Sequence, residues 1–266
     1  MDIARVIILL WMLGSCTAVN AADLTADQHY ANGLSLLSQN DGSTDTSVNH
    51  AGLLSAIEEL EKALAMGIKP NKDVRLALSK AYYVCMTIAD STKERPMNDK
   101  EKNAVECRKK GSVLIKHLNE EFPDDPRVLE QFAKSSIFDK ELQITIYEKL
   151  VKIGSKDANV HGELASLYLG KGKNNEGIAQ YREAIMLGVD PRIVAHYLEN
   201  LDTIFDEFGC PLEGLKELTR KIAFTDTPSF DAQPQVKEKF NVEFAQLKKQ
   251  VIKKIDSNRC KKLSNK

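Results

Sequence analysis

The sequence predicts an all-α protein, and three observations lead to that prediction. First, no stretch sustains the alternation of apolar and polar residues that a half-buried strand requires. Second, prolines and glycines fall between the runs with helical periodicity. Third, helical runs with similar endings recur, for example AIEELEKALAMGIKP at 56–70 and IAQYREAIMLGVDP at 178–191. With 28% charged residues, 42% hydrophobic residues and a net charge of −1, the composition is that of an ordinary globular protein.

Residues 1–21 have the pattern of an export signal. Arg5 precedes the apolar run VIILLWML, which is too short to span a bilayer. Two endings are open: cleavage before Ala22, or a bacterial lipobox at 13–16 that would place lipid on Cys16. An uncleaved anchor helix is disfavoured because the run is short and lacks charge on its far side. We therefore expect a periplasmic protein or a lipoprotein anchored in the outer membrane.

After this signal we expect a helical repeat domain over residues 22–229 and a separate basic segment over 230–266. The repeat domain is predicted to hold five helix pairs: 25–38 with 52–67, 73–90 with 99–120, 125–136 with 139–154, 157–169 with 174–188, and 191–207 with 211–223. The polar segment 39–51 is interpreted as a tolerated insertion in the first pair. The second pair is longer, with its turn around 92–99.

The pair at 157–188 carries a regular pattern of small and large residues. The positions at issue are Leu164, Ala165 and Tyr168 on the first helix, and Gly177, Tyr181 and Ala184 on the second. A small residue on each helix lets the backbones approach closely, and Gly172 suits the turn between them. This pattern resembles the tetratricopeptide repeat, a helix hairpin of about 34 residues. His161 stands where the family has a bulky residue, so we expect it to pack between helices.

Copies of the pattern occur elsewhere in the chain. They are Ala56, Leu60 and Ala63; Leu78, Ser79 and Tyr82; and Phe132 with Ala133. The resemblance therefore implies a right-handed superhelical solenoid of about four to five degenerate helix hairpins.

In this family the first helix of each hairpin lines a concave groove that binds a segment of another protein. Carried onto this chain, the resemblance implies these groove residues: Tyr30, Leu34, Lys80, Tyr83, Glu130, Lys134, Glu163 and Ser166. Some relatives clamp a terminal carboxylate with paired lysines and asparagines. Leu34 stands where one of those asparagines would be needed, so that clamp is not expected here.

Four cysteines follow the signal: Cys85, Cys107, Cys210 and Cys260. None forms a C-x-x-C pair, so neither a zinc knuckle nor a thioredoxin-like centre is expected. Cys85 and Cys107 lie about equally far from the turn near Pro96, which favours a disulfide across a helical hairpin in an oxidising compartment. A Cys210–Cys260 bridge would tie the last helix to the final hairpin. Four buried thiols are the other interpretation.

The segment 234–255 is predicted to form an amphipathic helix that caps the solenoid. Its apolar stripe consists of Val236, Phe240, Phe244, Leu247, Val251 and Ile255. The segment from Pro234 to Lys266 contains ten basic and three acidic residues, which give a net charge of +7. The basic residues are Lys237, Lys239, Lys248, Lys249, Lys253, Lys254, Arg259, Lys261, Lys262 and Lys266. This face is either solvated or in contact with an anionic membrane, and nucleic acid is not an expected partner.

No catalytic motif of the metalloprotease, hydrolase, phosphate-loop or dinucleotide-binding kind is present. The histidines are scattered, and neither a metal nor a cofactor is expected; they are His29, His50, His117, His161 and His196. We therefore expect a non-catalytic protein-binding scaffold or adaptor in the bacterial cell envelope. The alternatives are an envelope structural protein that touches membrane through its basic last helix, or an accessory subunit of an enzyme complex.

Overall fold

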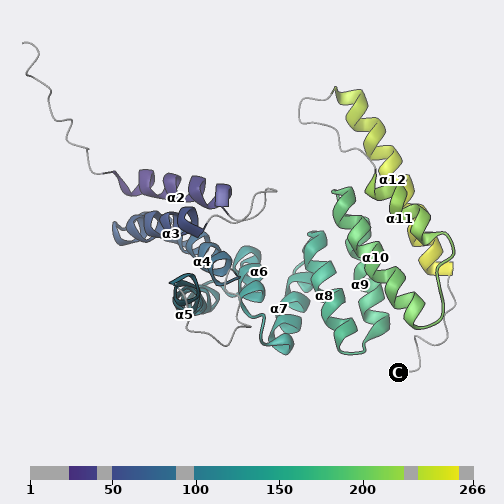
Figure 1. The fold of residues 1–266 in the computed structure, drawn as a ribbon, viewed down its shortest axis with the longest axis horizontal. Coiled ribbons are helices and arrows are strands. Elements are labelled where there is room, and N and C mark those ends of the chain that lie inside the picture. Colours follow the sequence, from purple (N-terminus) through teal and green to yellow (C-terminus); the bar gives the residue numbers. More distant parts are fainter. Residues whose placement is uncertain (1–23, 41–49, 88–98, 225–232, 258–266) are drawn as a thin grey trace, which may run out of the picture. The chain divides into compact units, whose positions relative to one another are not determined.

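A computed structural model describes residues 24–40, 50–87, 99–224 and 233–257. These residues form eleven helices and no strand, so the prediction of an all-α protein is confirmed (Figure 1). The helices are α2 (Ala26–Asn40), α3 (His50–Ala65), α4 (Asn71–Thr87), α5 (Asp99–Glu121), α6 (Pro126–Ser135), α7 (Lys140–Lys152), α8 (Ala158–Gly170), α9 (Asn174–Leu187), α10 (Pro191–Glu207), α11 (Leu215–Ala223) and α12 (Pro234–Ser257). The predicted signal segment 1–21 with Cys16, most of the insertion at 39–51, and Cys260 lie outside the described residues.

Most helix ends lie within three residues of their predicted positions, and α11 is the main exception. It begins at Leu215 rather than near residue 211. The residue before it, Gly214, has a left-handed backbone with φ of 75° and no side-chain hydrogen bond caps the helix. The segment after Cys210 therefore runs as a turn first, and the helix starts only after the glycine.

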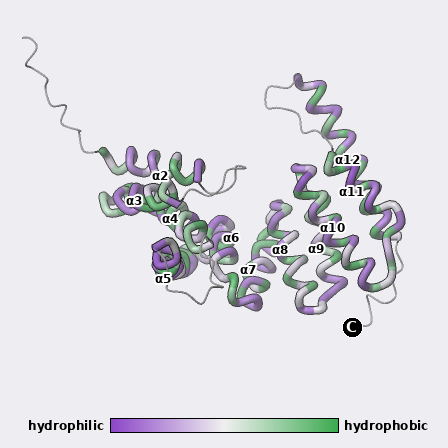
Figure 2. The backbone as a smooth tube through the Cα atoms, in the orientation of Figure 1, coloured by the Kyte–Doolittle hydropathy of each residue, from purple (hydrophilic) through white to green (hydrophobic). Residues whose placement is uncertain are grey.

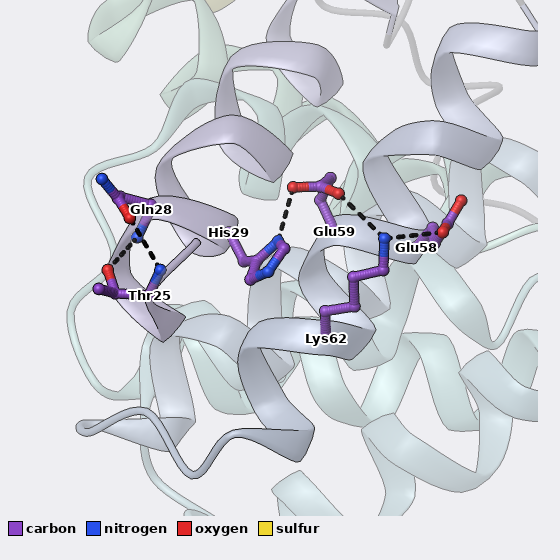
Figure 3. A network of polar contacts seen from close by, with 6 residues as sticks. All are labelled: Thr25, Gln28, His29, Glu58, Glu59 and Lys62. Atoms are coloured by element: carbon purple, nitrogen blue, oxygen red, sulfur yellow. Dashed lines mark hydrogen bonds and ion pairs between the residues drawn. The ribbon is translucent and has the colours of Figure 1, made fainter. Parts of the chain in front are cut away.

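The chain divides into two compact units, Met1–Ala104 and Val105–Lys266, with the boundary inside α5. In the first unit, Thr25 and Gln28 form a reciprocal cap at the start of α2: the Thr25 amide donates to Gln28 Oε1 at 2.8 Å, and the Gln28 amide donates to Thr25 Oγ1 at 3.3 Å (Figure 3). This capping fixes where α2 begins.

A hydrogen bond between side chains joins α2 to α3. His29 Nδ1 lies 2.8 Å from Glu59 Oε2, and Lys62 pairs with both Glu59 and Glu58 (Figure 3). The hydrogen bond from His29 lowers the pKa of Glu59. At Gly33 a side chain would overlap Leu60, since an added Cβ would lie 2.7 Å from Leu60 Cγ. The two helices therefore pack closely along the first half of α2.

In the second unit, consecutive helices from α6 to α11 lie side by side (Figure 1). Three of them begin with the same cap. Asp125, Asp157 and Asp190 precede α6, α8 and α10, and each accepts a hydrogen bond from the backbone amide two residues on. The caps stand 32 and 33 residues apart. The second unit therefore repeats a helix start at a nearly constant interval.

Hydrophobic clusters form the core of the described part of the second unit. One is formed by α6, α7 and the inner face of α8, around Leu129, Tyr147 and Leu164. Another runs from α8 to α12 and includes Tyr181, Leu198, Phe205 and Leu215. Along each helix hydrophobic residues alternate with hydrophilic ones, as expected where one face packs and the other meets solvent (Figure 2).

The close approach predicted between α8 and α9 is confirmed. At Gly177 an added Cβ would lie 2.6 Å from Leu169 Cγ and 3.1 Å from the carbonyl oxygen of Ala165. Gly172, in the turn, has a φ of 74°, as its predicted role requires. His161 is buried as predicted, and its two ring nitrogens face Gln180 Oε1 at 2.8 Å and the carbonyl oxygen of Ser155 at 3.3 Å.

Helix α12 packs against α9 and α11. Phe244, Val251 and Ile255 of the predicted apolar stripe are buried there, whereas Val236 at the other end of the stripe is 51% exposed. Phe240 and Leu247 are partly buried against the same core, so the stripe covers it from Phe240 onward.

Two lysines that the sequence assigned to the basic face of α12 turn toward the protein instead. Lys248 Nζ donates to the carbonyl oxygens of Met186 and Gly188 at 2.9 and 2.8 Å, at the end of α9. Lys254 Nζ donates to the carbonyl oxygen of Glu213 at 2.7 Å. The carbonyls of Met186 and Gly188 stand at the C-terminal end of α9, where the last carbonyls lack helical partners and a cation suits the negative end of the dipole. Glu213 lies in the turn that precedes α11. The position of Lys248 therefore follows from the need of the α9 end for donors.

Cys85, Cys107 and Cys210 are disulfide-bonded. The interpretation of these three residues as free buried thiols is therefore wrong. Which cysteines pair with one another stays a prediction.

Candidate functional site

A hollow of about 550 Å³, lined mostly by polar residues, lies between α8 and α10 in the second unit. We call it the α8–α10 hollow. The caps at Asp157 and Asp190 start both helices in the same way. Its lining consists of Asn159, Gly162, Glu163, Ser166, Asp190, Arg192, Ile193, His196, Tyr197 and Asn200.

A chain of hydrogen bonds runs from the floor of this hollow to its surface. Tyr181 comes from α9 and is only 2% exposed. Its hydroxyl lies 2.8 Å from Ser166 Oγ and accepts a hydrogen bond from Asn200 Nδ2 at 3.1 Å. Ser166 Oγ donates to the carbonyl oxygen of Gly162 at 3.2 Å, so the Tyr181 hydroxyl is the donor to Ser166. The network thus fixes the orientation of two lining side chains, Ser166 and Asn200.

Tyr197 organises the opposite end of the hollow. Its hydroxyl donates to Asn159 Oδ1 at 3.1 Å and to the carbonyl oxygen of Ala158 at 3.3 Å. Burial, aided by the negative charges of Glu163 and Asp157, raises the pKa of Tyr197 to about 12. The ring also occupies the space beside Gly162, where an added Cβ would meet it at 2.5 Å. A larger residue than glycine at position 162 would therefore displace Tyr197.

The guanidinium of Arg192 is bound to Asp190, with Nη2 3.2 Å from Oδ2. Burial acts to raise the pKa of Asp190, but hydrogen bonds from the Arg192 side chain and backbone outweigh it, so the pKa is lowered. Arg192 and Asp190 thus balance each other. Glu163, which is exposed, has no ion-pair partner among the residues that the structure describes.

The first unit has a hollow of a different character, about 470 Å³ in volume, between α2 and α4. We call it the α2–α4 hollow. It is lined by Leu34, Ser35, Leu37, Ser38, Ala77 and Lys80. Leu34 is 39% exposed and Lys80 is exposed, so the surface combines an aliphatic side chain with one cation.

Four of the eight residues that the repeat resemblance implied therefore line hollows. Leu34 and Lys80 share the α2–α4 hollow, and Glu163 and Ser166 share the α8–α10 hollow. Tyr30 and Tyr83 are half-buried on α2 and α4. Glu130 and Lys134 form an ion pair with each other at 2.5 Å on α6, and this contact satisfies both charges.

The repeat resemblance did not indicate the contribution of α10, which supplies Ile193, His196, Tyr197 and Asn200. The signal that could have found it is the cap. Aligning Asp190 with Asp157 places His196 at the position of Glu163 and Arg192 at that of Asn159.

On α12, the inward turn of Lys248 and Lys254 leaves Lys239, Lys249 and Lys253 exposed. A membrane contact through these lysines stays a prediction. Among the helices that the structure describes, none combines the length and apolar character needed to cross a bilayer.

The chain matches no known protein family, and no curated protein is similar to it in sequence.

Proposed function

We propose that this chain is a non-catalytic scaffold that binds a segment of another protein in hollows between alternate helices of a tetratricopeptide-like array. The observation that carries the proposal is the α8–α10 hollow. It holds Glu163 and Ser166, two of the residues for which the repeat resemblance implies a binding role. The α2–α4 hollow, with Leu34 and Lys80, supports the same assignment in the first unit.

Two recurring contacts support a repeat architecture. The aspartate caps of α6, α8 and α10 recur at 32 and 33 residues, close to the length of one repeat. In addition, Tyr82 on α4 donates to Glu61 on α3 at 2.5 Å, and Tyr168 on α8 donates to Glu148 on α7 at 2.7 Å. Tyr82 and Tyr168 are the equivalent positions of the proposed repeats, and each binds the helix before its own.

We place this activity in the bacterial envelope, in the periplasm or at the outer membrane. The supporting features are the pattern of residues 1–21 and the disulfide bonds of Cys85, Cys107 and Cys210, which persist in an oxidising compartment. The mass of the N-terminal peptide from the exported protein distinguishes a lipid-bearing Cys16 from a free Ala22.

The test is a mild crosslink and affinity capture from envelope extract, with charge-reversal variants in each hollow. Lys80→Glu alters the α2–α4 hollow and Glu163→Lys alters the α8–α10 hollow. Their controls are Lys116→Glu and Glu183→Lys, which make the same changes at exposed positions outside both hollows. All four side chains are exposed, so the variants are expected to fold, and circular dichroism melting checks this.

The proposal predicts a stoichiometric partner that is lost with at least one hollow variant and kept with both controls. If both hollow variants retain the partner as well as the wild type does, the protein binds through another surface and the proposal fails.

A further inference from the structure

The two asparagines of the α8–α10 hollow use opposite ends of their carboxamide groups in hydrogen bonds to tyrosines. Asn159 accepts the Tyr197 hydroxyl through Oδ1, so its Nδ2 group is left as a donor. Asn200 uses Nδ2 toward the Tyr181 hydroxyl at 3.1 Å and toward His196 Nε2 at 3.4 Å, so its Oδ1 is left as an acceptor. Neither of these two atoms has a partner within the part of the chain that the structure describes.

One donor and one acceptor, each fixed by a tyrosine, match the groups of a polypeptide backbone. Every peptide unit offers one carbonyl acceptor and one amide donor. In an extended chain these groups are not satisfied internally, so they are available to Asn159 and Asn200. Because the tyrosine contacts hold both carboxamides in place before a ligand arrives, less side-chain entropy is lost on binding.

The charge of the hollow selects among polypeptides. Arg192 is balanced by Asp190 at 3.2 Å, which leaves the Glu163 carboxylate as the unbalanced charge of the lining. Asp157, at the start of α8, adds a second negative charge nearby, and both carboxylates act on Tyr197. A cationic side chain is therefore favoured and an acidic one is repelled.

We infer that the α8–α10 hollow binds an extended polypeptide segment of a partner protein that carries a lysine or arginine. Asn159 and Asn200 hold its backbone, and Glu163 binds its cation. This inference rests on the proposed function, because it names the chemistry of the ligand that one of the two hollows takes.

The experiment uses the full exported chain with its disulfides intact. The probe is an array of seven-residue peptides, acetylated and amidated so that no terminal charge contributes. The central position is lysine, arginine, glutamine or glutamate, and the flanking positions are varied. The tightest peptide is then titrated in solution by fluorescence anisotropy.

We expect peptides with central lysine or arginine to be enriched and those with central glutamate to be depleted. Glu163→Gln should weaken the tightest peptide about tenfold, the scale of one hydrogen bond to a charged group. Glu163→Lys should shift the preference to glutamate. The matched control, Glu183→Gln, removes an exposed carboxylate from α9 outside the hollow and should leave binding unchanged.

A second variant tests the backbone contact separately. Asn159→Leu removes the Nδ2 donor while Tyr197 keeps its hydrogen bond to the Ala158 carbonyl oxygen, so folding should be preserved. It should weaken lysine and glutamine peptides by the same factor, about tenfold. A loss confined to lysine peptides would contradict the assigned role of Asn159.

The inference is overturned if acidic peptides are preferred, or if Glu163→Gln binds as tightly as the wild type. Peptide binding that is lost with Lys80→Glu alone would also overturn it, since the ligand would then lie in the α2–α4 hollow and the proposed function would stand. If no peptide binds while the captured partner is still lost with a hollow variant, only the inference fails. If there is neither a bound peptide nor a captured partner, both fail.

Discussion

At the scale of single residues, the hydroxyl of Tyr181 shows how a buried atom organises a surface. The ring fills the core, as the position predicts, and only 2% of the residue is exposed. The hydroxyl still needs hydrogen-bond partners, because an unsatisfied buried polar group is costly. It finds them in Ser166 and Asn200, and in doing so it orients two side chains of the α8–α10 hollow.

The small residues of the α8–α9 hairpin give the first prediction. Ala184 is fully buried, so Ala184→Trp must displace neighbouring side chains and should destabilise the second unit by about 3 kcal/mol or more. The control is Ala179→Trp, at an exposed position of the same helix, which should change the free energy of unfolding little. Chemical denaturation measures both. Equal stability of the two variants would contradict the assigned packing.

Two tyrosines give a prediction about alkaline pH. Burial raises the pKa values of Tyr168 and Tyr197 to about 12, aided by neighbouring carboxylates. In the unfolded chain a tyrosine ionises near pH 10. Above that pH the unfolded state binds fewer protons than the folded state, so stability should fall as pH rises from 10 to 12.

The near-ultraviolet absorbance of tyrosinate measures this titration. Part of the signal from the seven tyrosines should appear only at about pH 12 or on unfolding. Tyr197→Phe should reduce that late part. A late phase of unchanged size in this variant would show that Tyr197 titrates normally.

At the scale of helices, the sequence predicted which helices exist and where they end. Apolar periodicity and proline or glycine breaks are local signals, so they can be interpreted without the tertiary structure. This prediction failed at the start of α11, where the left-handed Gly214 delays the helix. The sequence also did not predict which helix faces contact one another in the folded protein. Asn200 was missed because its role depends on Tyr181, which is 19 residues away and on another helix. Lys248 was assigned to solvent because the free carbonyls of α9 are 60 and 62 residues away from it.

The docking of α12 gives the next prediction. Lys248 Nζ lies 4.8 Å from the centroid of the Phe244 ring. Lys248→Met keeps an apolar side chain over this ring but removes the hydrogen bonds to the carbonyl oxygens of Met186 and Gly188. Burial lowers the pKa of Lys248, so removing the charge recovers part of the loss. We expect a net destabilisation of about 1 kcal/mol, seen as faster amide exchange in α12.

The neighbouring Lys249 supplies the control, since it is exposed. Lys249→Met should leave exchange in α12 as it is in the wild type. If both variants behaved alike, the contact between Lys248 and the end of α9 would not contribute to docking.

At the scale of the whole molecule, the division into two compact units predicts separate responses to damage. Leu60 in the first unit and Leu198 in the second are both fully buried, so each change to alanine should cost about 2–5 kcal/mol. Hydrogen exchange should accelerate mainly in α2–α4 for Leu60→Ala and mainly in α8–α12 for Leu198→Ala. Acceleration spread evenly over both units in either variant would show that the chain opens as one cooperative body.

The placement of α12 also has a consequence for biogenesis. Phe244, Val251 and Ile255 close the core built by α8 to α11, and Lys248 completes the end of α9. Ribosomes make these residues after every other part of that core. Until they emerge, the nascent second unit carries an open apolar surface, which is the form that holdase chaperones and secretion machinery recognise. Folding of this unit is therefore tied to the completion of synthesis, and a chain released before Phe244 would remain a client of those chaperones.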